Sequence, residues 1–193
     1  MAKKVYQLKI SLRFITPEIW RRILLPADYS LTDLHKIIQT CMGWSNKESH
    51  RFIVKARSFM APSKAGEKMK KWDYIDYEQK DVRVADILKK PRNKIAYEYD
   101  LDKSWLHDIV LEEILPFDDE FKYPMCVGGK NNTPPESFEG PEKYNKMLES
   151  LFNPDNEEYK TLQKWREKGF DPDYYNRTIV NLNLHKDNFG SPA

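Results

Sequence analysis

The chain has 193 residues, enough for one domain with a buried core, and a formal net charge of +2 at pH 7. Its aromatic content of 13% excludes an intrinsically disordered chain, and no apolar run is long enough to span a membrane. Two cysteines, Cys41 and Cys126, are too few for a disulfide framework, and the first ten residues lack the layout of a signal peptide. We therefore expect a cytoplasmic protein.

The small net charge conceals an uneven distribution of charge along the chain. Residues 1–72 carry an excess of Lys and Arg, whereas residues 98–120 are rich in Asp and Glu. One interpretation is that the basic half binds nucleic acid, with Arg21 and Arg22 beside a base-stacking Trp20. The other, which we favour, is that the two segments face each other across a sheet, because opposite charges on adjacent strands stabilise their pairing.

Two strands open the chain. Residues 5–15 alternate between apolar and polar side chains, which is the period of a half-buried strand, and Thr16-Pro17 interrupts the pattern. Residues 19–26 supply a second apolar set, and the short connection predicts an antiparallel hairpin. The side chains expected to face the core are Tyr6, Leu8, Ile10, Leu12, Phe14, Ile19, Ile23 and Leu25.

One main helix follows the hairpin. Ser30 is suited to cap its first turn, and Asp33 stands where a capping box needs an acidic side chain. Apolar residues recur at helical spacing up to Met42, and Gly43 is suited to end the helix. Cys41 lies on the apolar side, so its predicted role is packing.

The middle of the chain alternates between strand-like and polar segments. We expect strands at residues 49–57, 94–100 and 105–115, and a short helix at residues 81–90. Residues 58–81 are rich in lysine and show no periodicity. They are predicted to form a long surface excursion.

The last third of the chain is predicted to be helical. Residues 116–140 are rich in Gly and Pro and are expected to form a loop. Pro141 suits the first position of a helix, a second helix is expected at residues 157–168, and Pro172 is expected to start the last one. The side chains predicted to be buried are Tyr144, Met147, Leu148, Leu151 and Phe152, then Tyr174, Tyr175, Ile179 and Leu182.

Strands early in the chain and helices late in it indicate one α+β domain over residues 1–193. We divide it into a sheet-rich part (1–115) with one main helix, a Gly/Pro-rich loop (116–140) and a helical part (141–186). The β-β-α-β opening predicts an antiparallel or mixed sheet, arranged as a roll or a β-grasp-like sheet, with a C-terminal group of helices.

The sequence lacks the common signatures of nucleotide binding and catalysis. It contains no GxGxxG, GxxxxGK[ST], HExxH, GxSxG or CxxC motif. We therefore favour a protein that binds a partner over an enzyme, and we expect no cofactor.

A metal site is the alternative for four polar residues. Zinc prefers Cys and His ligands and also accepts carboxylates. His50, His107, Cys126 and Glu136 would supply one sulfur, two nitrogens and one oxygen to zinc or another divalent ion. The competing interpretation is that both histidines are hydrogen-bonded strand residues and that Cys126 is a small buried apolar side chain.

A second candidate site is a pocket lined by Asp100, Trp105 and Thr133. The first two lie at an acidic turn between two predicted strands, and Thr133 lies in the Gly/Pro-rich loop. The competing interpretation, which we favour, is a solvated acidic turn with Trp105 in the core.

Several segments resemble one known family when they are taken together and in order. They are IWRRILLPADYSLTDLHKIIQTCMGW, YDLDKSWLH, CVGGKNNTPPE, GPEKY and GFDPDYYN. The chain resembles the Ri-plasmid open-reading-frame-three-like (plasmid pRiA4b ORF-3-like) family, whose members are also labelled insertion-element passenger or "TnpR-like" proteins. Members typically read YDFGDSWEH and carry a second loop cysteine, whereas this chain reads YDLDKSWLH and has Thr133 in place of that cysteine.

The resemblance covers residues from about Tyr6 to His185 and implies a single-domain α+β fold and an association with plasmids and other mobile DNA. It implies little about activity. Our leading hypothesis is therefore an uncharacterised plasmid- or insertion-element-associated protein that is a non-enzymatic binding or accessory module for a protein or nucleic-acid partner. The alternatives are a nucleic-acid-binding protein using the basic N-terminal half, and a metal-dependent hydrolase-like enzyme at His50, His107, Cys126 and Glu136.

Overall fold

A computed structural model describes residues 3–60, 75–153 and 155–191. Its centre is an eight-stranded sheet in the order β5-β4-β3-β6-β7-β1-β2-β8. All neighbouring strands are antiparallel except β4 and β5, which are parallel. The strands are β1 (Lys4–Leu12), β2 (Trp20–Pro26), β3 (His50–Val54), β4 (Arg57–Met60), β5 (Ile75–Glu78), β6 (Lys94–Tyr99), β7 (Trp105–Pro116) and β8 (Met125–Lys130).

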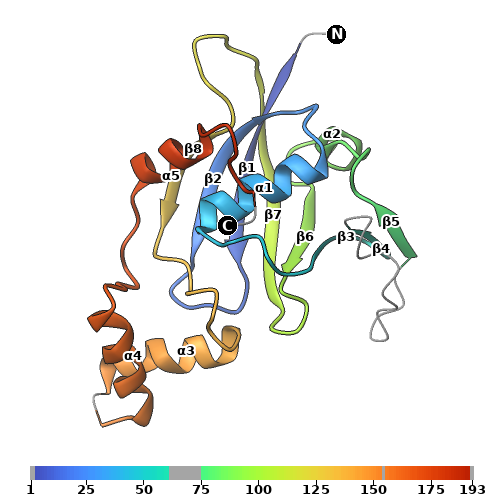
Figure 1. Ribbon diagram of the computed structural model, residues 1–193. Helices are drawn as coiled ribbons and strands as arrows, with labels where there is room; N and C mark the ends of the chain where they lie inside the picture. The colour runs from blue at the N-terminus through green and yellow to red at the C-terminus, as the bar shows by residue number, and fades with distance from the viewer. Residues whose placement is uncertain (1–2, 61–74, 154, 192–193) are drawn as a thin grey trace.

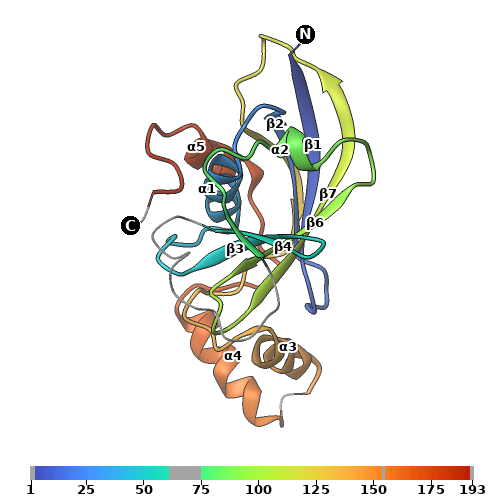
Figure 2. The same cartoon turned by 90° about the vertical axis from the view of Figure 1, so that its right-hand side faces the viewer.

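The helices occupy two places around the sheet. α1 (Leu31–Met42) and α5 (Arg177–Leu184) lie against one face of the sheet (Figures 1 and 2). α3 (Pro141–Glu149) and α4 (Glu157–Glu167) form a helical arm beyond one end of it. Within the described ranges, no helix is long and apolar enough to cross a membrane. The helices are α1 (Leu31–Met42), α2 (Val84–Ile87), α3 (Pro141–Glu149), the 3-10 turn η1 (Ser150–Phe152), α4 (Glu157–Glu167) and α5 (Arg177–Leu184). The α+β fold with C-terminal helices is therefore confirmed.

The two faces of the sheet differ in chemistry because apolar and polar residues alternate along β1 and β2. The apolar set faces α1 and is buried, as the alternation predicts for Tyr6, Leu8, Ile10, Leu12, Ile23 and Leu25. The opposite face carries ion pairs between strands, including Arg13 with Asp108 and Arg22 with Glu112. The basic and acidic segments of the sequence thus pair across the sheet.

α1 forms where its end signals predict it. The Ser30 hydroxyl accepts the Asp33 N–H at 3.1 Å, and the Asp33 carboxylate accepts the Ser30 N–H at 3.0 Å. Gly43 ends the helix in the left-handed region at φ 73°, where a side chain would add strain. Cys41 is buried against the sheet, as predicted for a packing residue.

Removing the cap should lower stability measurably. We expect Ser30→Ala to reduce the free energy of unfolding by about 1 kcal/mol, because the Asp33 N–H loses its acceptor and the Asp33 carboxylate loses the hydrogen bond from the Ser30 hydroxyl. Thr32→Ala, in the same turn but outside the capping box, is the matched control. Urea denaturation of both variants measures the difference, and equal effects would contradict a specific role for the cap.

The structure corrects the prediction that residues 116–140 are loop throughout. Met125–Lys130 forms β8, which pairs with β2 at the edge of the sheet. Gly128 and Gly129 made this strand unrecognisable from the sequence, since glycine has low β propensity. Gly129 is needed there because a Cβ at that position would lie 2.6 Å from the Tyr175 ring.

The region between β3 and α2 also differs from its prediction. Residues 49–57 were expected to form one strand and residues 58–81 a surface excursion. Instead β3 and β4 form a hairpin and β5 adds a parallel strand, while residues 61–74 lie outside the described part of the chain.

Several apolar residues predicted to be buried are exposed. α5 begins at Arg177 instead of Pro172, because Pro172 is buried and its carbonyl accepts the Asn132 N–H at 2.7 Å. α5 therefore begins five residues later than predicted, and the side of the helix that faces the sheet is not the predicted one. The exposed residues are Phe14, Phe152, Tyr174, Ile179 and Leu182.

Candidate functional site

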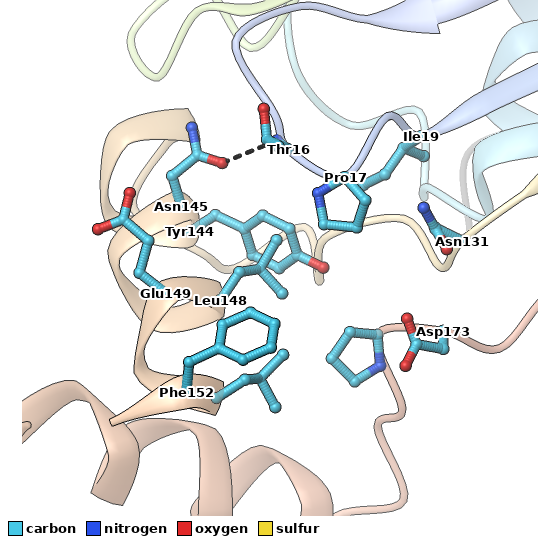
Figure 3. A pocket seen from close by; sticks show the side chains of 12 residues that line it. Thr16, Pro17, Ile19, Asn131, Tyr144, Asn145, Leu148, Glu149, Phe152 and Asp173 are labelled. Atoms are coloured by element: carbon cyan, nitrogen blue, oxygen red, sulfur yellow. Dashed lines mark hydrogen bonds between the residues drawn. The ribbon is translucent and has the colours of Figure 1, made fainter. Parts of the chain in front are cut away.

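A cleft of about 490 Å³ lies where the β1–β2 turn approaches α3. We call it the α3 cleft. One wall is the β1–β2 turn, the second is α3 with η1, and the third is the segment before α5 (Figure 3). Its lining is Thr16, Pro17, Ile19, Asn131, Tyr144, Asn145, Leu148, Glu149, Leu151, Phe152, Pro172 and Asp173.

Two asparagines hold the walls of the α3 cleft together. The Asn145 carboxamide oxygen accepts the Thr16 N–H at 3.2 Å, and its amino group donates to the Phe14 carbonyl. These bonds tie α3 to the β1–β2 turn, 129 residues away in sequence. Asn131, at the end of β8, donates to the Glu18 carbonyl at 2.9 Å on the same turn. The cleft thus has fixed walls, which suits a preformed binding site.

Tyr144 occupies the floor of the α3 cleft. Its ring, on α3, packs edge-on against Phe138 and Phe170. Its side chain points toward the opposite walls of the cleft (Figure 3), and its hydroxyl is buried without a hydrogen-bond partner among the described residues. Burial, with a smaller contribution from the Asp173 charge, raises the pKa of Tyr144, so its hydroxyl remains protonated at neutral pH.

The rim of the α3 cleft combines apolar and acidic groups. Phe152 is 92% exposed at one lip, although the sequence pattern predicted it in the core. Its exposure follows from η1, the 3-10 turn that succeeds α3 and changes the direction of its side chains. Glu149 and Asp173 add two exposed carboxylates to the lining.

Three of the four predicted metal ligands lie along one row of aromatic side chains. They are His50, His107 and Glu136. The His50 ring stacks on His35 with 3.4 Å between ring centroids, and its Nε2 lies 3.1 Å from the Gln79 carboxamide oxygen. The His107 ring packs edge-on to Trp44 with centroids 5.4 Å apart. Glu136 accepts the Ser45 N–H at 2.9 Å and the Tyr99 hydroxyl proton. Each side chain is thus engaged with its own neighbours.

His107 is the least satisfied member of this row. It is completely buried, and neither ring nitrogen makes a well-formed hydrogen bond with a described residue. Burial lowers the pKa of His107 to about 4, against a smaller opposing effect of the nearby Tyr97 and Trp105 carbonyls. The ring is therefore neutral at physiological pH.

Cys126 lies apart from that row, in a second polar cluster beside β2. Its thiol is 3.2 Å from the Tyr175 hydroxyl. A hydrogen bond with Cys41, with smaller contributions from Tyr175 and the Arg21 charge, lowers the pKa of Cys126 against the opposing effect of burial. Among the residues that the structure describes, no group of three or more His, Cys, Asp or Glu side chains is placed to hold a metal ion.

The predicted pocket residues Asp100, Trp105 and Thr133 are all buried but lie outside the α3 cleft. Asp100 forms an ion pair with Lys103 at 2.9 Å. Trp105 is 1% exposed in the core, and Thr133 accepts an N–H of Arg21 at 3.2 Å. The three side chains therefore make contacts inside the folded protein and do not line the α3 cleft.

The two arginines predicted to contact nucleic acid have intramolecular partners. Arg21 is 3% exposed and donates to the backbone carbonyls of Cys41 and Lys130 at 3.1 and 2.9 Å. Arg22 lies on the outer face of the sheet, where Glu112 accepts two of its N–H groups at 2.6 and 2.9 Å. Neither guanidinium is thus presented freely to a phosphate.

Little in the sequence indicates the α3 cleft. Tyr144 and Leu148 fit the apolar side of a helix, and this pattern alone predicts a core. The most informative signal was a tyrosine on that side, since a buried hydroxyl needs a partner. Contact between residues 129 positions apart cannot be inferred from periodicity.

The chain is similar in sequence to a bacterial protein, in sequence and structure to an archaeal one, and to one family model. The uncharacterized protein y4hQ of Sinorhizobium fredii (strain NBRC 101917 / NGR234) is 26% identical over 166 residues, which cover 86% of this chain and 82% of the relative. The crystal structure of MM3350, a protein of unknown function from Methanosarcina mazei Go1, is 33% identical. It superposes with a TM-score of 0.77, covering 92% of this chain and 98% of that one.

The family match extends from β1 to the first residues of α5, and so includes the sheet, α1, the helical arm and all the residues that line the α3 cleft. Its range, residues 4–178, agrees with the motifs that gave the resemblance in sequence. The chain belongs to the plasmid pRiA4b ORF-3-like protein family.

Proposed function

We propose that this protein is a non-enzymatic binding module and that the α3 cleft is its binding site. The observation that carries the proposal is the buried Tyr144 hydroxyl, which points into an apolar cleft and has no partner in the described part of the chain. An unsatisfied hydroxyl is costly in a folded protein. A ligand that bonds to it recovers that cost, which favours the bound state.

The size and walls of the α3 cleft support the same proposal. A volume of about 490 Å³ is that of a site for a small organic molecule. Pro17, Leu148 and Leu151 supply apolar surface, and the exposed ring of Phe152 extends it at the lip. The catalytic arrangements that would argue for an enzyme, such as a nucleophile beside a base, are absent from the residues lining this cleft.

Ligand occupancy can be tested by nuclear magnetic resonance. A panel of small apolar fragments containing neutral, basic and acidic members is titrated into isotope-labelled protein. We expect backbone signals of the β1–β2 turn and α3 to shift, and Leu151→Trp to abolish the shifts by filling the cleft. Leu182→Trp, an exposed leucine on α5 outside the cleft, is the matched control. If no fragment of any class shifts these signals, the proposed function is wrong.

Tyr144→Phe separates a binding role from a structural one. Because the hydroxyl has no partner within the described ranges, its removal should leave the free energy of unfolding unchanged or raise it by up to about 1 kcal/mol. The same variant should weaken binding of any fragment that hydrogen-bonds to the hydroxyl. Thermal and urea denaturation measure the first effect, and a loss of more than about 1 kcal/mol would indicate a structural hydroxyl.

A further inference from the structure

The charged side chains that line the α3 cleft have one sign only. Glu149 and Asp173 are the acidic members of the lining, and no Lys, Arg or His of the described residues belongs to it. Neither carboxylate forms an ion pair with another residue of the described chain. Both are exposed to solvent; the Asp173 side chain lies across the cleft from Tyr144, whereas Glu149 extends from the outer side of α3 at the rim (Figure 3).

Elsewhere on α3, and just before it, acidic side chains form ion pairs with lysines. Lys146 pairs with Glu142 at 2.8 Å along the helix, and Lys143 pairs with Glu139 just before it. Such pairs, four residues apart, neutralise acidic side chains on the surface of a helix. Glu149 has no such partner among the described residues, and it is the acidic side chain of α3 that lines the cleft.

We propose that the α3 cleft selects a small organic cation, in which a protonated amine is attached to an aromatic or branched aliphatic body. This inference rests on the proposed binding function of the cleft. Leu148, Leu151 and Phe152 would contact the apolar body of the ligand. Asp173, on the wall that faces Tyr144, would attract the ammonium group, and Glu149 would add to the negative potential at the rim.

Tyr144 completes the recognition of the cation. Its hydroxyl oxygen has a free acceptor site that can take one ammonium N–H, and the phenol stays neutral because burial disfavours its ionised form. A carboxylate ligand would instead meet two like charges and find no cationic side chain in the lining. The cleft therefore discriminates by repulsion as well as by attraction.

Three probes of nearly equal size and different charge test this selectivity. They are 2-phenylethylamine, 2-phenylethanol and 3-phenylpropionate, titrated separately while the signals of the β1–β2 turn and α3 are followed. We expect the amine to bind about three- to tenfold more tightly than the alcohol, since each exposed charge contributes modestly. The acid should bind more weakly than both, and added salt should reduce the advantage of the amine.

The double variant Glu149→Gln/Asp173→Asn identifies the source of any preference. It should reduce the affinity for the amine to that of the alcohol, without changing the affinity for the alcohol. Glu120→Gln, an exposed carboxylate in the β7–β8 connection, is the control for loss of one negative charge. Equal binding of amine and alcohol, or an unchanged preference in the double variant, would overturn the selectivity while leaving the binding function intact. Failure of all three probes to shift the cleft signals would overturn both.

Discussion

Glu98→Gln is expected to lower the free energy of unfolding by about 3–5 kcal/mol. Glu98 and Arg51 form an ion pair at 2.6 Å between β6 and β3, with side chains only 5% and 3% exposed. Ser104 donates a further hydrogen bond to Glu98 at 2.6 Å. The loss is large because the substitution removes the carboxylate charge that offsets the buried guanidinium.

The ion pair on the outer face of the same sheet provides the comparison. Glu112→Gln removes the partner of Arg22, but those side chains are 22% and 34% exposed, so water screens the remaining charge. Its expected cost is about 1 kcal/mol or less. Urea denaturation at pH 7 measures both variants, and similar losses would contradict the role assigned to burial.

A double replacement tests whether the buried charge, and not the lost contact, causes the instability. Arg51→Met/Glu98→Leu removes both charges, and apolar side chains in place of a buried pair are often neutral or stabilising. We expect this double variant to be more stable than Glu98→Gln. A loss equal to or greater than that of Glu98→Gln would show that the contacts themselves dominate.

The second large effect is acid destabilisation through His107. Its pKa is about 4 in the folded protein and near 6.5 in an unfolded chain. Between these values the unfolded state binds a proton that the folded state does not, so stability falls as pH decreases. The full contribution, about 3 kcal/mol, is present above pH 6.5 and is lost progressively as the pH falls toward about 4.

His107→Leu should remove this pH dependence. We expect the variant to be within about 1 kcal/mol of the parent at pH 7.5, because both ring nitrogens lack well-formed hydrogen bonds to the residues described. At pH 4.5 it should be more stable than the parent. Chemical denaturation at several pH values measures the two curves, with His185→Leu, at the end of α5, as the control. Parallel curves for the parent and His107→Leu would contradict the prediction.

Local rules accounted for the elements whose residues carry their own signals. The alternation in residues 5–12 predicted β1 and its buried face, and Ser30, Asp33 and Gly43 predicted both ends of α1. The ion pairs between the basic and acidic segments were also predicted, although their partners are far apart in sequence: Asp108 and Glu112 on β7 meet Arg13, just after β1, and Arg22 on β2. That prediction came from the distribution of charge along the chain, whereas those of β1 and α1 rest on periodic or neighbouring residues.

Local rules failed where a distant partner decides the outcome. β8 forms because β2 supplies its hydrogen bonds and Tyr175 needs the space that Gly129 leaves. α5 starts late because Asn132 binds the Pro172 carbonyl and holds the preceding segment in an irregular path. Phe14 and Phe152 fit apolar patterns but are exposed, since a turn and a 3-10 segment redirect them.

Consecutive residues are sufficient to specify the α+β class, the β-β-α-β order, the ends of α1 and the family. Periodicity, caps and the motifs are written in consecutive residues, and they act before the chain is compact. The α3 cleft depends on tertiary packing, which brings Tyr144, Asn145 and Asp173 to the β1–β2 turn. These segments are far apart in the chain, so no local pattern could place the Tyr144 hydroxyl, which has no partner among the described residues, beside the carboxylate of Asp173.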